Sequence, residues 1–237
     1  MLPPIHLWGI SAPLEPLGGG HRNAVFRTSE LARDLVFKST RRTEAQLRWL
    51  APVHAAAETA GFVTPRLIPD RTGRLNADGW TCEPFIEGRP FQPEDLPQIA
   101  ERIDAFHAAT ANLPQRPEFC SSCELLTETT GGDVDLTALP ADLMALCRCA
   151  WQALGSETGV IHGDLTAGNL IHTDQGPALI DWDEARVDHR AYDRLRTRPE
   201  TATAAEKTAA LAWEVAASWQ IEPDHAQLVA RILRARF

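Results

Sequence analysis

Apolar and polar residues alternate with a period of two in several short segments of the first third of the chain, a pattern typical of β-strands. In residues 34–39, Leu35 and Phe37 share one face while Val36 and Lys38 share the other. Similar segments flank a glycine-rich turn within residues 14–27 and cover residues 63–69 and 80–85. The pattern therefore predicts five strands in this part of the chain.

Helical periodicity interrupts these strands once and then dominates the rest of the chain. Thr43 is a suitable N-cap, and Pro52 predicts a break near residues 50–51 before a helical stretch at 53–60. Residues 112–135 are rich in Pro, Ser, Thr and Gly, which predicts an irregular connection. Amphipathic helices are predicted at residues 96–110, 141–154, 203–219 and 223–236.

Residues 160–183 depart from the helical pattern. Short apolar segments lie at 160–161, 170–171 and 178–181, separated by a glycine-containing loop and by a tight turn at 174–177. This order predicts a loop that leads into a β-hairpin. A sheet followed by helices that surround one hairpin is an α+β arrangement.

Length and composition limit the class of protein. A chain of 237 residues can form one large core or two small lobes. No apolar run approaches the ~20 residues of a membrane span, and the first residues do not resemble a signal peptide. Five cysteines, an odd number, fit a reducing compartment. We therefore expect a soluble, cytoplasmic protein without a membrane partner.

The net charge of −9 is unevenly distributed. Residues 1–88 contain 10 Lys and Arg against 9 Asp and Glu, whereas residues 89–237 contain 13 against 23. This excess of acids argues against nucleic acid as a partner. It suits a cationic small molecule through electrostatic attraction, although a requirement for solubility explains it equally well.

The polar residues on either side of the predicted hairpin form the strongest candidate site. His162, Asp164 and Asn169 precede it, and Asp181 and Asp183 follow it. Amide and carboxylate oxygens suit magnesium, so Asn169 and Asp181 are candidate metal ligands, and Asp164 remains to orient an attacking hydroxyl. His-x-Asp-x-x-x-x-Asn is also the spacing of a kinase catalytic loop.

The sequence HGDLTAGNL at 162–170, followed by IDWD at 180–183, resembles the aminoglycoside phosphotransferase and choline-kinase-like branch of the protein-kinase fold. Proteins of this branch have Gly after the His, and a second acid after the Asp-aromatic pair. The resemblance implies a two-lobed protein-kinase-like fold. Its parts would be an N-lobe with a five-stranded antiparallel sheet and one helix (1–81), a hinge (82–88), and a mainly helical C-lobe with the catalytic hairpin (89–237).

The resemblance also implies a set of phosphate-binding residues. The turn at Gly18, Gly19, Gly20 and Asn23 resembles the family's Gly-Gly-x-x-Asn turn, whose backbone amides approach phosphates. A plain hairpin turn would explain the glycines alone, but their position just before an apolar strand with one lysine favours the phosphate role. Lys38 is one of only two lysines in a chain that otherwise uses arginine, which favours a phosphate contact over a solvated position.

Further roles follow from the same resemblance. Glu44 would pair with Lys38, or would serve as a helix-start acid. The hinge would bind adenine through the Glu83 carbonyl and the Phe85 amide, with Cys82 at the back of that pocket. The remaining supporting residues would be His162, which braces the catalytic loop, Asp183, which contacts metal or substrate, and Asp193, a buried aspartate that bonds the loop backbone.

These observations predict an ATP- and Mg²⁺-dependent transfer of phosphate to a hydroxyl of a small molecule. The 56 residues after Asp181 do not fit the long activation segment of protein kinases, which favours a small acceptor over a folded protein. The sequence does not identify that acceptor, nor decide between ATP and GTP. The alternatives are a catalytically silent nucleotide-binding regulator and a module that holds zinc through Cys120, Cys123, Cys147 and Cys149.

Overall fold

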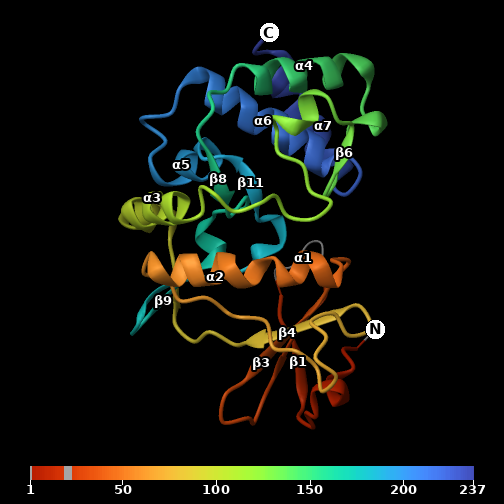
Figure 1. The fold of residues 1–237 in the computed structure, drawn as a ribbon, viewed down its shortest axis with the longest axis vertical. Coiled ribbons are helices and arrows are strands. Elements are labelled where there is room, and N and C mark those ends of the chain that lie inside the picture. The colour runs from red at the N-terminus through yellow and green to blue at the C-terminus, as the bar shows by residue number, and fades with distance from the viewer. Residues whose placement is uncertain (1, 19–22) are drawn as a thin grey trace. The chain divides into compact units, whose positions relative to one another are not determined.

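The computed structural model describes residues 2–18 and 23–237, so the predicted roles of Gly19 and Gly20 lie outside the described residues. The chain forms two compact units (Figure 1). The first consists of Met1–Phe91 with Leu170–Ile180, and the second of Gln92–Asn169 with Asp181–Phe237. Over the described ranges, no helix combines the length and the apolar character that crossing a membrane requires.

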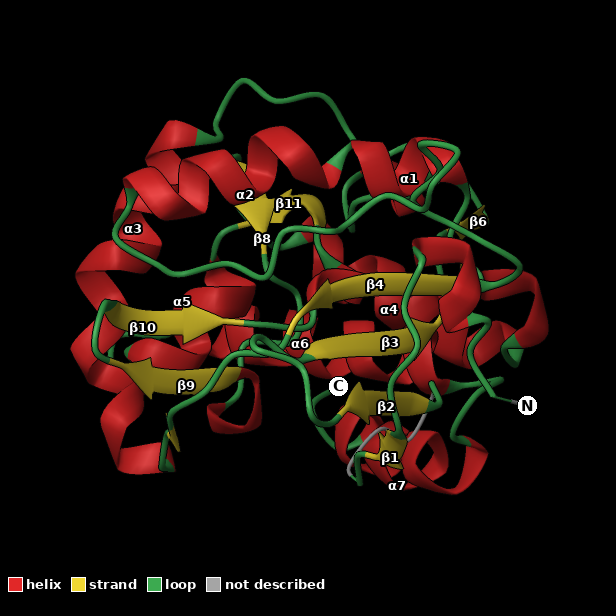
Figure 2. Cartoon of the chain, turned by 90° about the horizontal axis from the view of Figure 1, so that it is seen from below, coloured by secondary structure: helices red, strands yellow, loops and turns green. Residues whose placement is uncertain are grey.

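The first unit contains a four-stranded antiparallel sheet in the order β1-β2-β3-β4 (Figure 2). Its apolar face packs around Phe37, Trp80 and Cys82, and Trp8 meets Phe37 edge-on at 5.3 Å. The alternation predicted for residues 34–39 is therefore confirmed, because Phe37 enters this core while Val36 and Lys38 lie on the other face. The strands are β1 (Leu14–Pro16), β2 (Val25–Thr28), β3 (Leu35–Ser39) and β4 (Trp80–Pro84).

The prediction of a fifth strand in this sheet is wrong. Residues 63–69 form only an isolated bridge, in which the Val63 amide donates to the Pro177 carbonyl at 2.9 Å. Pro65 and Pro69 have no N–H group and cannot continue a ladder of hydrogen bonds. A single bond from the Ile68 amide to the Cys82 carbonyl, at 2.7 Å, joins this segment to β4.

The expected single helix of this unit is two short ones, α1 (Glu44–Arg48) and α2 (Leu50–Thr59). Thr43 and Gln46 form a reciprocal capping box at the first N-terminus. The break falls at Trp49, slightly earlier than predicted, because Pro52 lies in the first turn of α2, where its missing N–H costs no helical bond.

The predicted β-hairpin is confirmed. β9 (Leu170–Thr173) and β10 (Gly176–Leu179) pair in register, and β5 (Arg89–Pro90) extends them into a three-stranded sheet in the order β10-β9-β5. The turn is formed one residue earlier than predicted, at Asp174 and Gln175, because Pro177 pairs with His172 inside β10. Since Leu179 faces Leu170, the residues directly before β9 and directly after β10 meet at one end of the hairpin.

The second unit is mainly helical, and α4, α6 and α7 pack together over a core that includes Leu143, Val215 and Leu233 (Figure 1). The helix predicted at residues 96–110 begins as 3₁₀ turns, because Pro97 cannot donate to an α-helical ladder. The α-helices are α3 (Ala100–Ala109), α4 (Ala141–Gln152), α5 (Ala191–Thr197), α6 (Ala204–Ser218) and α7 (Pro223–Arg234).

Short elements connect these helices. Two strand pairs occur, β8 (Thr158–Ile161) with β11 (Arg186–His189), and β6 (Thr130–Gly131) with β7 (Val134–Asp135). The 3₁₀ turns are η1 (Ile5–Trp8) in the first unit and η2 (Pro93–Ile99), η3 (Glu124–Leu126), η4 (Leu136–Ala138), η5 (Ala167–Asn169) and η6 (Trp182–Glu184) in the second.

Substitution of Phe37 tests whether the apolar face of the first sheet stabilises the fold. Phe37→Ala removes a ring with 0% exposure and leaves a cavity, so we expect the free energy of unfolding to fall by about 3–5 kcal/mol. Phe237→Ala, at a position 60% exposed, is the matched control and should change it by less than about 0.5 kcal/mol. Urea unfolding followed by tryptophan fluorescence measures both, and equal effects would contradict the core assignment.

Candidate active site

The loop between β8 and β9, residues 162–169, brings an acid and an amide together. The Asn169 Nδ2 group donates to the Asp164 carbonyl oxygen at 2.8 Å and to the Asp164 carboxylate at 2.9 Å. Both side chains are half-buried. Because these two acceptors fix the orientation of the amide, its oxygen Oδ1 points away from Asp164 and is the candidate metal-binding atom of Asn169.

Asp193 on α5 holds the start of this loop. Its carboxylate, 1% exposed, accepts the backbone N–H groups of His162 at 2.8 Å and of Gly163 at 3.2 Å. Nε2 of His107 on α3 lies 3.0 Å from the same carboxylate. Burial alone would raise the pKa of Asp193, but the hydrogen bond and the charge of His107, together with His162, outweigh it, so this pKa lies below its ordinary value.

Two contacts join the 162–169 loop to the segment that follows the hairpin. The His162 ring is fully buried and meets Trp182 edge-on, with the ring centroids 4.9 Å apart. Gly163 has a φ of +85°, and a Cβ atom there would lie 2.6 Å from the Glu184 carbonyl oxygen. Only glycine fits this position, because it needs both left-handed backbone and a close approach.

Asp181 comes directly before Trp182 and has left-handed backbone, with a φ of 62° and a ψ of 68°. Such a conformation is unfavourable for a residue that carries a Cβ, and surrounding contacts must maintain it. The hairpin register places Asn169 and Asp181 at the same end of the hairpin, and both belong to the second unit. Asn169 directly precedes β9 and Asp181 lies two residues after β10, and their joint binding of a metal stays a prediction.

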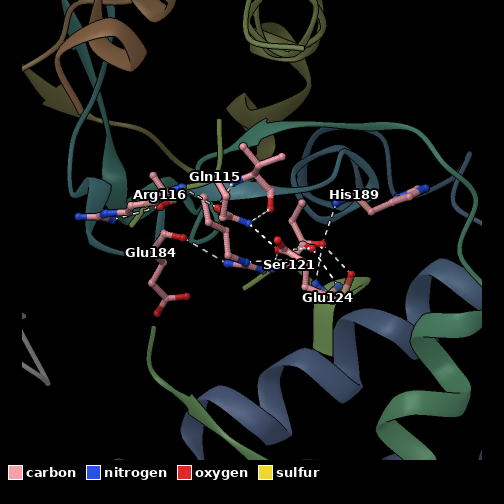
Figure 3. A network of polar contacts seen from close by, with 12 residues as sticks. Gln115, Arg116, Ser121, Glu124, Glu184 and His189 are labelled. Atoms are coloured by element: carbon pink, nitrogen blue, oxygen red, sulfur yellow. Dashed lines mark hydrogen bonds and ion pairs between the residues drawn. The ribbon is translucent and has the colours of Figure 1, made fainter. Parts of the chain in front are cut away.

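Arg116 holds the segment after Asp181, and no pattern in the sequence indicated this residue (Figure 3). This arginine is 0% exposed, and its Nη1 group donates to the carbonyl oxygens of Trp182 at 3.2 Å, Asp183 at 2.9 Å and Ala185 at 3.1 Å. It lies in the stretch predicted to be an irregular connection, where no periodicity marks a buried position. The two roles considered for Asp183, metal ligand and substrate contact, stay predictions.

The residues around Arg116 form a connected polar network (Figure 3). Gln115 pairs its side-chain amide with both backbone groups of Val187, at 2.8 and 2.9 Å, and so occupies one edge of β11. Glu124 accepts from Gln115 at 3.1 Å and from the Ser121 amide at 2.7 Å. Further along β11, the buried Asp188 carboxylate binds Ser122 through the hydroxyl at 2.6 Å and Arg186 through Nε at 2.9 Å.

The predicted phosphate-binding residues belong to the first unit. Lys38 is half-buried on β3, between Val25 of β2 and Thr81 of β4, and Asn23 and Gly18 lie in the connection between β1 and β2. The Glu44 carboxylate accepts the backbone amides of Leu75 at 2.9 Å and Asn76 at 3.1 Å, and pairs with Arg48 at 2.6 Å. Its ion pair with Lys38 stays a prediction.

Two expectations for the hinge need correction. The Phe85 amide donates to the Asp34 carbonyl at 2.9 Å, so this N–H group already has its partner and cannot donate to adenine in this arrangement. Cys82 pairs with Phe37 across β3 and β4 and lies in the apolar core, on the face opposite Lys38. Glu83 lies opposite Val36 in the same ladder, inside β4, and its contact with adenine stays a prediction.

The cysteines do not gather into a site. No three His, Cys, Asp or Glu side chains among the described residues form a group that could hold a metal ion. Cys147 is buried, which raises the pKa of its thiol to about 12, whereas Cys123 and Cys149 are exposed. The Cys120 thiol donates to the Thr130 carbonyl at 3.3 Å. The described part of the chain therefore gives no support to the zinc-binding module.

The fold resembles several solved structures. The GDP and kanamycin complex of APH(2")-IIia is 13% identical, with 98% of this chain and 96% of that chain covered and a TM-score of 0.62. A thermostable mutant of the aminoglycoside phosphotransferase APH(4)-Ia, with ADP and hygromycin B, is 13% identical, with 98% and 95% covered and a TM-score of 0.64. A choline/ethanolamine kinase family protein from Mesorhizobium loti is 17% identical, with 98% and 92% covered and a TM-score of 0.57.

At these identities the likeness establishes the fold, which is the kinase-like fold of small-molecule phosphotransferases. A profile of the phosphotransferase enzyme family matches residues 13–231. This match spans most of the chain, so the chain belongs to that family and is a small-molecule phosphotransferase. The family expected from residues 162–183 is thereby confirmed. No curated protein sequence matches the chain.

The lowered pKa of Asp193 predicts how the free energy of unfolding changes at low pH. Because the pKa of Asp193 is lower in the folded chain than the value near 3.9 of an unfolded aspartate, its contribution is complete above about pH 4. That contribution is lost as the pH falls through the folded-state pKa. Asp193→Asn leaves a backbone amide without an acceptor, and we expect it to lower the free energy of unfolding at pH 5 by about 1–3 kcal/mol.

Urea unfolding of both proteins between pH 5 and pH 3 measures this effect. The difference between wild type and Asp193→Asn should shrink as the pH falls below about 4. Asp174→Asn, in the exposed hairpin turn, is the control and should match the wild type throughout. A wild-type advantage that is absent at pH 5, or that stays constant down to pH 3, would show that Asp193 does not stabilise the loop as a carboxylate.

Proposed function

We propose that the chain transfers the terminal phosphoryl group of ATP to a hydroxyl group of a small molecule, and that this reaction depends on Mg²⁺. The observation that carries this proposal is the pair of hydrogen bonds by which Asn169 holds Asp164. One side chain thereby orients an acid toward an acceptor and an amide oxygen toward a metal. Membership of the phosphotransferase enzyme family supports the reaction class.

Asp164 is proposed to orient the acceptor and to take its proton. Asn169 engages carboxylate oxygen Oδ2, which leaves Oδ1 to accept a hydrogen bond from the acceptor hydroxyl. The acceptor oxygen forms a bond to the γ-phosphorus, the bond from the γ-phosphorus to the bridging oxygen breaks, and ADP leaves. Because the proton departs late in a loose transition state, orientation of the hydroxyl contributes more than the basicity of Asp164.

Asn169 and Asp181 are proposed to hold the metal. Both offer hard oxygen atoms, and the amide orientation of Asn169 frees its oxygen for this purpose, so the donor set fits Mg²⁺. When bound, Mg²⁺ neutralises the negative charge of the phosphates. Magnesium keeps several waters and takes few protein ligands, so two side chains are sufficient.

The first unit is proposed to bind the nucleotide. Lys38 would neutralise the phosphates, with Gly18, Gly19, Gly20 and Asn23 in the phosphate-binding turn and Glu44 as the partner of Lys38. The Glu83 carbonyl remains a candidate for adenine, but the N–H donor must come from a residue other than Phe85. Structures of similar fold that contain GDP or ADP support nucleotide binding without deciding between the two bases.

An acceptor that carries positive charge is the third part of the proposal. Residues 117–147 contain six acids and no lysine or arginine, and Arg116 and Gln115 join the start of this stretch to the segment after Asp181. Negative charge beside a site raises the local concentration of a cation. The kanamycin and hygromycin B of the two phosphotransferase complexes are compatible with such an acceptor.

Substitutions of Asp164 and Asp181 should affect nucleotide binding and turnover separately. A panel of amino-alcohols, amino acids, sugars and aminoglycosides, assayed for ADP release, first identifies an acceptor. Asp164→Asn should then keep Mg-ATP binding and lose at least 10²-fold in kcat, whereas Asp181→Ala should lose the Mg²⁺-dependent part of nucleotide binding. Calorimetry and steady-state kinetics measure these effects, with Asp174→Asn as a control at an exposed acid.

Normal turnover by Asp164→Asn would refute the role of Asp164. Mg-ATP binding without phosphorylation of any acceptor, and without slow ATP hydrolysis, would instead identify a catalytically silent nucleotide-binding protein.

The two lysines of the chain allow a matched comparison that tests the contact of Lys38 with the nucleotide. Lys38→Met removes the ammonium group proposed to contact phosphate, and we expect KM for ATP to rise or kcat to fall by at least tenfold. Lys207→Met removes the other lysine, which is exposed on α6, and should leave both constants unchanged. Equal behaviour of the two variants would remove Lys38 from the nucleotide site.

A further inference from the structure

Arg116 is an unusual residue to find fully buried, because a guanidinium group is costly to remove from water unless its donors are well used. It is 0% exposed, and its Nη1 group lies within 3.2 Å of three backbone carbonyl oxygens. These carbonyls belong to Trp182, Asp183 and Ala185, so one side chain donates to the backbone of three of the four residues that follow Asp181.

The position of Arg116 is itself fixed from two sides. Its guanidinium lies over the Phe119 ring, 4.5 Å from the ring centroid, and its backbone amide donates to the Gln115 side-chain oxygen at 2.9 Å. That same oxygen accepts the Val187 amide at 2.9 Å. Arg116 and Gln115 therefore hold residues 182–187 at several points, as Figure 3 shows.

The segment that Arg116 holds is linked to both candidate functional groups through their neighbours in the chain. Asp181 immediately precedes it in left-handed backbone, which neighbouring contacts must maintain. Glu184 lies within it, and its carbonyl is packed so closely against Gly163 that no Cβ would fit between them. Gly163 is adjacent to Asp164. A shift of residues 182–185 would thus move Asp181 directly and Asp164 through Gly163.

We infer that Arg116 is a positioning residue for the metal ligand Asp181. It keeps the carbonyls of Trp182, Asp183 and Ala185 in place and thereby maintains the left-handed conformation that directs Asp181 toward the metal. This inference rests on the proposed function, because it assumes that Asp181 binds Mg²⁺. Groups that orient a metal ligand without touching the metal change metal affinity by about 10–100-fold when they are removed.

The test compares two arginines of the second unit that both donate to backbone carbonyls. Arg116→Met should raise the Mg²⁺ concentration for half-maximal stabilisation of the nucleotide complex by at least tenfold, and leave ADP binding in EDTA unchanged. Arg148→Met is the matched control, because Arg148 donates to the carbonyls of Leu125 at 3.1 Å and Glu128 at 2.9 Å. It should lose thermal stability but keep the wild-type Mg²⁺ dependence.

A second variant and a second measurement guard against simple unfolding. Arg116→Lys keeps the charge and three N–H donors without the planar fork, and should recover part of the Mg²⁺ affinity. Hydrogen exchange at 25 °C should show faster exchange at residues 181–187 in Arg116→Met, and at residues 125–128 in Arg148→Met. If Arg116→Met does not fold, Arg116→Lys carries the test with the same measurements.

The outcomes separate this inference from the proposed function. A folded Arg116 variant with wild-type Mg²⁺ dependence, in a protein whose wild type binds Mg-nucleotide, overturns the role of Arg116 alone. A wild type that binds nucleotide with no effect of Mg²⁺ overturns the proposed function, and the inference with it. A rise in the Mg²⁺ requirement of Arg148→Met equal to that of Arg116→Met would show a general loss of stability and would also overturn the inference.

Discussion

The Asp193 carboxylate accepts the backbone amides of His162 and Gly163, and the geometry of the whole 162–169 loop depends on this contact. A buried carboxylate is unfavourable unless donors replace its water, and three groups do so here, the two amides and His107. The loop contains no regular ladder beyond β8, so few other backbone bonds can hold it. Asp193 thus links α3 and α5 to the loop that contains the candidate catalytic residues.

The segment after Asp181 is held by a different means. Residues 182–184 form a short 3₁₀ turn, and this turn together with Ala185 presents several carbonyl groups to side-chain donors. Arg116 satisfies three of them, and Gln115 supplies an amide to the edge of β11 at Val187. Side chains that are distant in the sequence, Gln115 and Arg116, therefore supply the hydrogen bonds that regular secondary structure supplies elsewhere. They do so directly after Asp181, whose backbone is left-handed.

Errors in the sequence interpretation have common physical causes. Residues 63–69 show strand-like alternation, yet Pro65 and Pro69 remove the donors that a central strand needs, and Val63 bonds instead to Pro177 near the end of the hairpin. The Phe85 amide, a candidate partner of adenine, donates instead to the carbonyl of Asp34, the residue directly before β3. Pro65 and Pro69 are visible in the sequence, whereas the hydrogen-bond partners of Val63 and Phe85 come from distant parts of the chain and leave no local pattern.

By itself, the sequence determined the identity and order of the polar groups around the hairpin, because their spacing and the turn that follows are local properties. Asp164 and Asn169 are five residues apart in one loop, and within that loop the Asn169 amide donates to the Asp164 carboxylate. The family resemblance also implied that Asp193 bonds the loop backbone, but only the tertiary structure showed which other side chains support the loop and the segment after Asp181. Asp193, His107 and Arg116 reach the site through folding over long sequence distances, and a buried arginine in an aperiodic stretch has no signature that distinguishes it from an exposed one.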